Sequence, residues 1–184
     1  MTLHSDAHSV LTRWAAPDDE QEQLRVTYLA HLDGHANATS RHCHPDHLTA
    51  SALIVSADHQ RVLLTLHHVI KRWLQTGGHI DTEDESLAEA ALREAFEESG
   101  IASLALDPVP VLLSRHEVPK CGPIRPSHHL DVQFVAVAPP DALHVISDES
   151  DELEWFAIDN LPAETDHSVR ALIAASTTRL RGTP

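Results

Sequence analysis

The stretch from Gly77 to Ile101 constrains the fold of this chain most strongly, because it indicates a glycine-containing loop that leads into one helix. A glycine pair at its start is typical of a turn or of a close approach between the backbone and another element. Thr82 or Asp84 can cap the segment that follows, and Gly100 suits the C-terminal end of a helix. The sequence therefore predicts a helix from about Asp84 to about Ser99.

On a helical wheel of about 100° per residue, this segment has an apolar arc and an acidic stripe. The arc, which we expect to face the core, contains Leu87, Ala88, Ala91, Leu92, Ala95 and Phe96. The stripe contains Glu94, Glu97 and Glu98. Two carboxylates about 5 Å apart repel each other by roughly 3 kcal/mol at an effective dielectric constant of 20. The stripe is therefore either a solvated face paired with arginine or a set of oxygen ligands for a hard divalent cation.

The nine residues from Arg93 to Ile101, REAFEESGI, resemble the second half of the Nudix box, with every fixed position filled. Gly77, Gly78 and Glu85 resemble its first half, and the resemblance extends over about residues 47–160. One feature departs from the family pattern, which has five residues between its last glycine and its first glutamate. Six residues separate Gly78 from Glu85, so either the loop carries an extra residue or His79 occupies the glycine position.

The resemblance implies the Nudix α/β/α sandwich, a mixed sheet with the box helix on one face and the C-terminal helix on the other. It also implies metal-dependent hydrolysis of a phosphoanhydride bond in a nucleoside diphosphate linked to another group, with Mg²⁺ or Mn²⁺ as the cofactor. Two other classes share the fold. One is a catalytically silent nucleotide-sensing or interaction domain. The other is an isopentenyl diphosphate isomerase, which needs a catalytic cysteine in a context that neither cysteine of this chain has.

The resemblance also assigns roles to particular residues. The expected metal ligands are the carboxylates of Glu94, Glu97 and Glu98 and the backbone carbonyl of Gly78 or His79. Arg93 and Glu85 are expected to brace the loop against the helix. The expected general base is one of three carboxylates, Glu97, Glu94 and Glu149.

Glu149 belongs to an acidic cluster that precedes a predicted strand containing Trp155. Many Nudix enzymes have a second acidic cluster in such a position. By this resemblance Glu149 or Glu152 could complete the metal shell or act as the base. The other interpretation is a solvated acidic turn.

Five further residues are candidates for substrate binding. His79 directly follows the glycines, and it either contacts substrate or a metal-bound water or is an ordinary loop residue. His129 and Asp131 share one face of a predicted strand, so either they are a pocket pair or, in the alternative, His129 is a hydrogen-bonded histidine at the sheet end. Arg72 and Arg115 are candidates for phosphate contact, because a guanidinium group pairs well with phosphate oxygens.

The rest of the chain predicts strands on both sides of the box. They are expected at residues 48–56, 61–66, 109–114, 128–138 and 153–158, and a final helix is expected to start at Asp166 or Ser168. Residues 47–184 would form the Nudix domain. Residues 1–46 are predicted to be an N-terminal helical extension and linker, with a role in packing or in a homodimer.

Composition narrows the possible partners and location. The formal net charge of −15 argues against nucleic-acid polymers, since binding to their phosphates needs a basic surface, whereas a small polyphosphate neutralised by metal ions fits. No apolar run reaches the roughly 18 residues of a membrane span, and the N-terminus lacks a signal-peptide pattern, so a cytoplasmic location is expected. Cys43 and Cys121 fit no metal-binding spacing and are expected to be reduced thiols.

Overall fold

The computed structural model describes residues 2–118, 121–146 and 150–182, and its sheet is organised around one central strand, β1 (His47–Val55). β1 pairs in parallel with β7 (His128–Val137) over its whole length. Its other edge is shared by two antiparallel strands, β4 (Thr76–His79) along the first half and β2 (Arg61–His67) at the end. The sheet therefore forks at β1.

Four more strands complete a mixed eight-stranded sheet. β3 (Trp73–Leu74) and β8 (Ser150–Ala157) pair with β2, and β5 (Ala105–Leu106) and β6 (Leu112–Glu117) pair with β7. The strand expected at 109–114 begins three residues later than predicted. Pro108 and Pro110 precede it, and a proline has no amide hydrogen to donate to a neighbouring strand.

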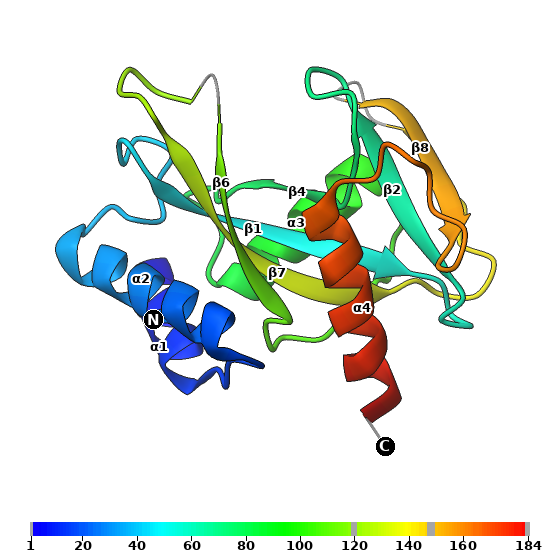
Figure 1. Ribbon diagram of the computed structural model, residues 1–184, viewed down its shortest axis with the longest axis horizontal. Coiled ribbons are helices and arrows are strands. Elements are labelled where there is room, and N and C mark those ends of the chain that lie inside the picture. The colour runs from blue at the N-terminus through cyan, green and yellow to red at the C-terminus, as the bar shows by residue number, and fades with distance from the viewer. Residues whose placement is uncertain (1, 119–120, 147–149, 183–184) are drawn as a thin grey trace.

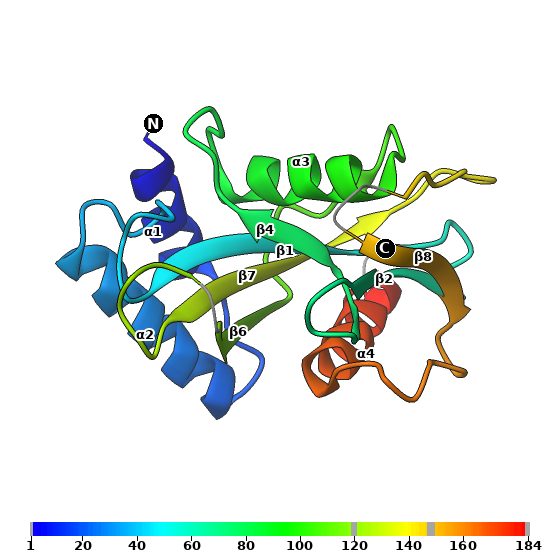
Figure 2. The same ribbon diagram turned by 90° about the horizontal axis from the view of Figure 1, so that it is seen from above.

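Helices cover both faces of the sheet, as the α/β/α sandwich requires. α3 (Leu87–Ser99) lies on one face and α4 (His167–Gly182) on the other, and Figure 2 shows the sheet between them. α1 (Leu3–Arg13) and α2 (Asp19–Gly34) lie near the start of β1 (Figure 1). Their buried side chains, which include Ala7, Leu11, Tyr28 and Leu32, join the apolar cluster between α3 and the sheet.

α3 confirms the predicted helix with two corrections. It begins after Ser86, whose side chain accepts a hydrogen bond from the backbone of Glu89, so neither Thr82 nor Asp84 is the cap. Its C-terminal cap is Gly100 in the left-handed conformation, as predicted. Phe96 does not face the core and is 51% exposed. Small side chains, mainly alanines, form the buried face instead, and they allow the helix to lie close to the sheet.

Alternate residues of β1 and β7 create the surroundings of the candidate site. Their register places His47 beside His129, Thr49 beside Asp131, Ser51 beside Gln133 and Leu53 beside Val135. The intervening residues of both strands are apolar and pack toward α3. Leu53 and Val135 pack with residues of α4. One sheet face is thus apolar where α4 covers it and polar where α4 does not, and the polar half is available to line a pocket.

Candidate active site

The glycine pair of β4 lies in close contact with β1 on one side and with α3 on the other. A Cβ atom on Gly77, where φ is +152°, would lie 2.3 Å from Cβ of Ser51 in β1. A Cβ atom on Gly78 would lie 2.7 Å from Oε2 of Glu94 in α3. At Gly77 the backbone and Cβ of the central strand therefore leave no room for a side chain. At Gly78 the close neighbour is the carboxylate end of the Glu94 side chain, so the backbone of β4 lies directly beside that carboxylate.

Three carboxylates of α3 gather beside this backbone. Glu94 and Glu97 each accept a hydrogen bond from Nη1 of Arg93, at 2.9 Å and 3.0 Å. Oε1 of Glu98 accepts a hydrogen bond from the backbone N–H of Gly77 at 3.3 Å. The side chain of Glu94 is 15% exposed and that of Glu97 is 53% exposed. The arrangement offers several hard oxygen donors beside a single guanidinium group, which is the donor chemistry that suits Mg²⁺ or Mn²⁺.

The residue that braces the loop against the helix is Asp84, and the expected pairing of Arg93 with Glu85 is wrong. Asp84 accepts hydrogen bonds from Nε of Arg93 at 3.0 Å and from Nη2 at 2.9 Å. These hydrogen bonds are the main reason why the pKa of Arg93 is raised. Nη2 also donates to the backbone carbonyl of His79 at 3.0 Å. Glu85 is exposed.

A turn explains why the acidic residue one position earlier takes this role. The backbone N–H of Asp81 donates to Oδ2 of Asp84 at 2.8 Å, and this contact turns the carboxylate inward. Five residues separate Gly78 from Asp84, which is the spacing that the first half of the box has. If Asp84 is counted as the acid of the box, the additional residue lies between Asp84 and Arg93.

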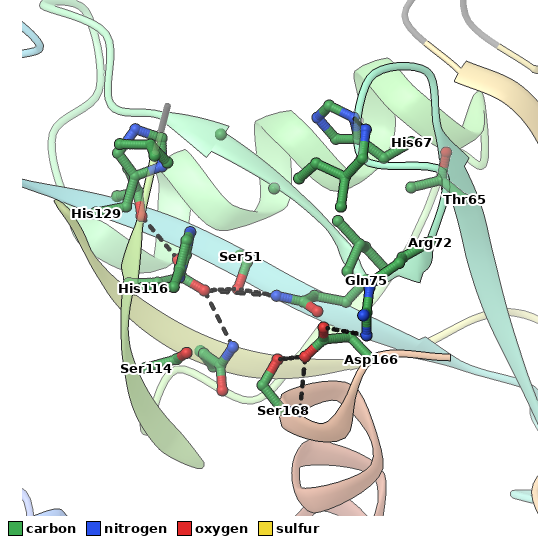
Figure 3. A pocket seen from close by; sticks show the side chains of 18 of the residues that line it. Ser51, Thr65, His67, Arg72, Gln75, Ser114, His116, His129, Asp166 and Ser168 are labelled. Carbon is green, nitrogen blue, oxygen red and sulfur yellow. Dashed lines mark hydrogen bonds and ion pairs between the residues drawn. The ribbon is translucent and has the colours of Figure 1, made fainter. Parts of the chain in front are cut away.

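A pocket of about 460 Å³ adjoins this cluster, and the polar half of the sheet lines it. The pocket meets the carboxylate cluster at Glu98 and at the backbone of Gly77 and Gly78, all of which line it. Figure 3 shows His116 and His129 at one end, Arg72 with Asp166 and Ser168 at the other, and Ser51 and Gln75 between them.

Four of the five residues proposed to bind substrate line this pocket, namely Arg72, His79, His129 and Asp131. Arg115 does not. It lies exposed on β6, where its Nη2 is 2.9 Å from Nδ1 of His128. Glu149 lies outside the described residues, and Glu152 is exposed on β8.

The buried carboxylate of Asp131 organises the floor of the pocket. It accepts hydrogen bonds from Oγ1 of Thr49 at 3.0 Å and from Oγ of Ser51 at 2.7 Å. Nε2 of Gln133 and Nε2 of Gln75 donate to it as well, at 3.1 Å and 3.5 Å. These neutral donors satisfy a carboxylate that would otherwise be costly to bury. Asp131 therefore holds neighbouring polar side chains in place along the pocket.

Sequence reasoning missed a second group of possible metal ligands, at the His129 end of the pocket. His47, His79, Cys121 and His129 each have one ligand atom within 4.8 Å of those of the other three. Burial lowers the pKa of His79 to about 4 and that of His129 to about 3. The one available signal was the strand pattern, because His47 and His129 each occur near the start of a predicted strand.

Comparison with known proteins places the geometry in a family. The model of the NUDIX domain family matches residues 45–175. A NUDIX-family hydrolase from Clostridium perfringens is 24% identical, with a TM-score of 0.60 over 73% of this chain and 97% of its own. The Escherichia coli dihydroneopterin triphosphate pyrophosphohydrolase is 20% identical, with a TM-score of 0.60 over 72% and 95%. The Caenorhabditis elegans Ap4A hydrolase is 18% identical, with a TM-score of 0.59 over 74% and 98%.

A comparison with curated proteins found no match. Among the described residues, no helix has the length and apolar character needed to cross a membrane.

Proposed function

This chain belongs to the Nudix family of hydrolases, and we propose that it cleaves a phosphoanhydride bond in a nucleoside diphosphate linked to another group, with Mg²⁺ or Mn²⁺ as the cofactor. The observation that carries the proposal is the set of three α3 carboxylates gathered beside Arg93 and the glycine pair. Two proteins of the same fold, the Ap4A hydrolase and the dihydroneopterin triphosphate pyrophosphohydrolase, are named for polyphosphate substrates.

The donor set fits the proposed cofactor. The carboxylates of Glu94, Glu97 and Glu98 and the backbone carbonyl of Gly78 would hold the ion, since all four offer oxygen atoms. The close approach of Gly78 to the Glu94 carboxylate supports this set. When bound, a divalent ion neutralises the diphosphate and lowers the pKa of the attacking water.

The protein's own residues would keep these carboxylates in position. Asp84 anchors two nitrogens of Arg93, which leaves Nη1 directed at Glu94 and Glu97. The guanidinium group thus offsets the repulsion between two neighbouring carboxylates while it fixes their side chains. The backbone N–H of Gly77 orients Glu98 in the same way. Such preorganisation reduces the rearrangement that the reaction requires.

Among the carboxylates, Glu97 is our first candidate for the general base. The side chain of Glu97 is more exposed than that of Glu94, so a proton that it accepts can pass readily to solvent. Glu94 and Glu149 are the other candidates.

We propose that the group linked to the diphosphate occupies the adjoining pocket. The pocket reaches the carboxylates at Glu98, and its volume of about 460 Å³ falls within the usual range for a small-molecule site. At the far end Arg72 offers a guanidinium group for an anionic part of the substrate, although it already contacts Asp166 at 3.3 Å. The expected partner is a small molecule, and the negative net charge disfavours a nucleic-acid polymer.

A substrate panel tests the proposal. Nucleoside diphosphate derivatives and triphosphates are incubated with the native chain and Mg²⁺ or Mn²⁺, and phosphate-containing products are measured. We expect turnover of at least one compound, with loss of turnover in EDTA and in Glu98→Gln. Glu89→Gln is the matched control, because it makes the same change on the same helix outside the cluster. Binding of a nucleotide without turnover under any of these conditions would favour the silent sensing domain instead.

A further inference from the structure

Four side chains outside the carboxylate cluster converge at the His129 end of the pocket. His47, His79 and His129 come from β1, β4 and β7, and Cys121 comes from the segment between β6 and β7. Sγ of Cys121 lies 3.6 Å from Nε2 of His47 and 3.6 Å from Nε2 of His79. In a tetrahedral zinc site, bonds of about 2.0 Å to nitrogen and about 2.3 Å to sulfur place these ligand atoms about 3.6 Å apart. The spacing therefore suits one shared ion.

The hydrogen bonding of His47 directs its second nitrogen toward the other three groups. Nδ1 of His47 lies 3.2 Å from the backbone carbonyl of Cys43. Because a carbonyl oxygen can only accept, Nδ1 must carry the proton, and Nε2 presents its lone pair to the Cys121 side. Histidines that bind metals commonly donate their other ring N–H to a carbonyl in this manner.

His129 contributes independent evidence, because its Nε2 atom is buried and has no hydrogen-bond partner among the described residues. Its ring centre lies 5.0 Å from that of His47 and 5.0 Å from that of His79. A buried polar atom without a partner destabilises a protein, and such atoms are uncommon. A cation at the centre of the cluster would give this imidazole the interaction that the surrounding protein atoms do not.

The pKa shifts of the three imidazoles are compatible with this geometry. Removal from water lowers the pKa of His47, His79 and His129, and in each case it is the largest cause. Burial thus favours the uncharged imidazole, which is the form that binds metals.

We propose that His47, His79, Cys121 and His129 form a binding site for a transition-metal ion of the Zn²⁺ type, distinct from the carboxylate site on α3. Imidazole and thiolate ligands favour such ions, whereas Mg²⁺ prefers oxygen. Four protein ligands complete a tetrahedral shell and leave no open position, so the role is structural. The site goes beyond the proposed hydrolysis and does not depend on it.

The ion would join four separate segments at one wall of the pocket. His79 directly follows Gly78, and its carbonyl accepts a hydrogen bond from Arg93, so the site adjoins the backbone that borders the carboxylates. Cys121 follows Val118, which lines the pocket, by three positions. Loss of the ion should therefore loosen the pocket wall and raise KM more than it lowers kcat.

Cobalt substitution tests the site without any substrate. The native chain is stripped with a chelator and titrated with Co²⁺, whose tetrahedral thiolate complexes absorb in the visible and near-ultraviolet range. We expect about one Co²⁺ per chain with such a spectrum, and its displacement by Zn²⁺. Cys43→Ser is the matched control: Cys43 faces His31 and supplies only its backbone carbonyl to the cluster. It should preserve the spectrum.

Two variants decide the assignment of the ligands. Cys121→Ser should lose the thiolate band, and His129→Gln should bind Co²⁺ at least about 100-fold more weakly, because even changes beyond the direct ligands cost 10–100-fold. Circular dichroism establishes that each variant is folded before its metal binding is compared. Absence of a tetrahedral spectrum in the native chain overturns the proposal, as does a native spectrum in either folded variant.

Discussion

The carboxylate cluster on α3 and the histidine–cysteine cluster lie on either side of the same backbone, at Gly78 and His79, yet they are built in opposite ways. The carboxylates lie within five consecutive residues of one helix, they are partly exposed and they are balanced by Arg93. The histidines and the cysteine come from four separate segments, and burial lowers the pKa of the three imidazoles. The two proposed sites would thus bring two different metal chemistries to the two sides of β4.

The two clusters differ in solvent exposure, and each degree of exposure suits the proposed role of its cluster. A site that must admit a polyanion and release protons needs exposed, charged oxygen atoms. A site that joins strands needs ligands fixed by burial, and burial favours neutral imidazoles over charged ones. The polar half of the β1 and β7 face supplies this burial, since it extends from His47 and His129 to the pocket floor at Asp131.

The largest expected effect separates the two clusters by function. Glu98→Gln should lower kcat by about 10²-fold or more, because it removes a charge next to the reacting phosphates. It should leave the zinc content of the chain unchanged. Steady-state kinetics and elemental analysis of the same preparation check both outcomes, with Glu89→Gln as the control. Loss of zinc together with activity would mean that the clusters form a single site.

The next effect concerns the histidine–cysteine cluster, where we expect a substitution to change stability and to leave kcat nearly unchanged. Cys121→Ser should lower the thermal unfolding midpoint of the zinc-loaded chain by about 5–10 °C, because ligand-linked stabilisation of about 3 kcal/mol is lost. kcat should stay within about threefold of the native value. Differential scanning calorimetry with and without added Zn²⁺ measures the shift. Cys43→Ser, in which the shift on adding Zn²⁺ should be preserved, is the control, and an equal response of both variants to Zn²⁺ would contradict the assignment.

A third prediction sharpens the description of the carboxylate side. Asp84→Asn should lower the free energy of unfolding by about 2 kcal/mol, since Asp84 is buried and makes two hydrogen bonds to a charged group. Glu85→Gln should change it by less than about 0.5 kcal/mol, because Glu85 is exposed. Urea denaturation of the two neighbouring variants distinguishes them. The reverse order would restore Glu85 as the brace.

The smallest expected effect concerns the ends of the pocket. Arg72→Ala should raise KM about fivefold, which corresponds to roughly 1 kcal/mol for a partly exposed charged contact. Arg115→Ala should change KM less than about twofold, because Arg115 lies outside the pocket and contacts His128. Kinetics on the substrate found by the panel compare the two arginines, and equal effects would show that the substrate extends beyond the pocket.

The sequence predicted the features that depend on neighbouring residues. The acidic stripe of α3, its glycine cap and most strands follow from local periodicity and from a contiguous motif. Two details of the same region were wrong for physical reasons. The turn between Asp81 and Asp84 selects the buried acid that pairs with Arg93, and wheel positions alone do not show that alanines rather than Phe96 contact the sheet.

The histidine–cysteine cluster escaped prediction because only the tertiary fold assembles it. His47 and His129 are 82 positions apart in the chain and become neighbours through the parallel register of β1 and β7. His79 joins them through the antiparallel pairing of β4 with β1. Local spacing rules for zinc sites do not apply to ligands brought together by strand pairing. Cys121 indeed fits no such spacing in the sequence, and for this reason the sequence did not indicate the cluster.

The most direct test of two separate sites is the metal content of the native chain, Cys121→Ser and Glu98→Gln after dialysis without chelator, measured beside their Mg²⁺-dependent turnover. We predict about one zinc per chain in the native protein and in Glu98→Gln, and little in Cys121→Ser. Turnover should require added Mg²⁺ or Mn²⁺ in the native protein and in Cys121→Ser, and should be lost in Glu98→Gln. A native chain without zinc, or zinc that Cys121→Ser retains, would contradict the account.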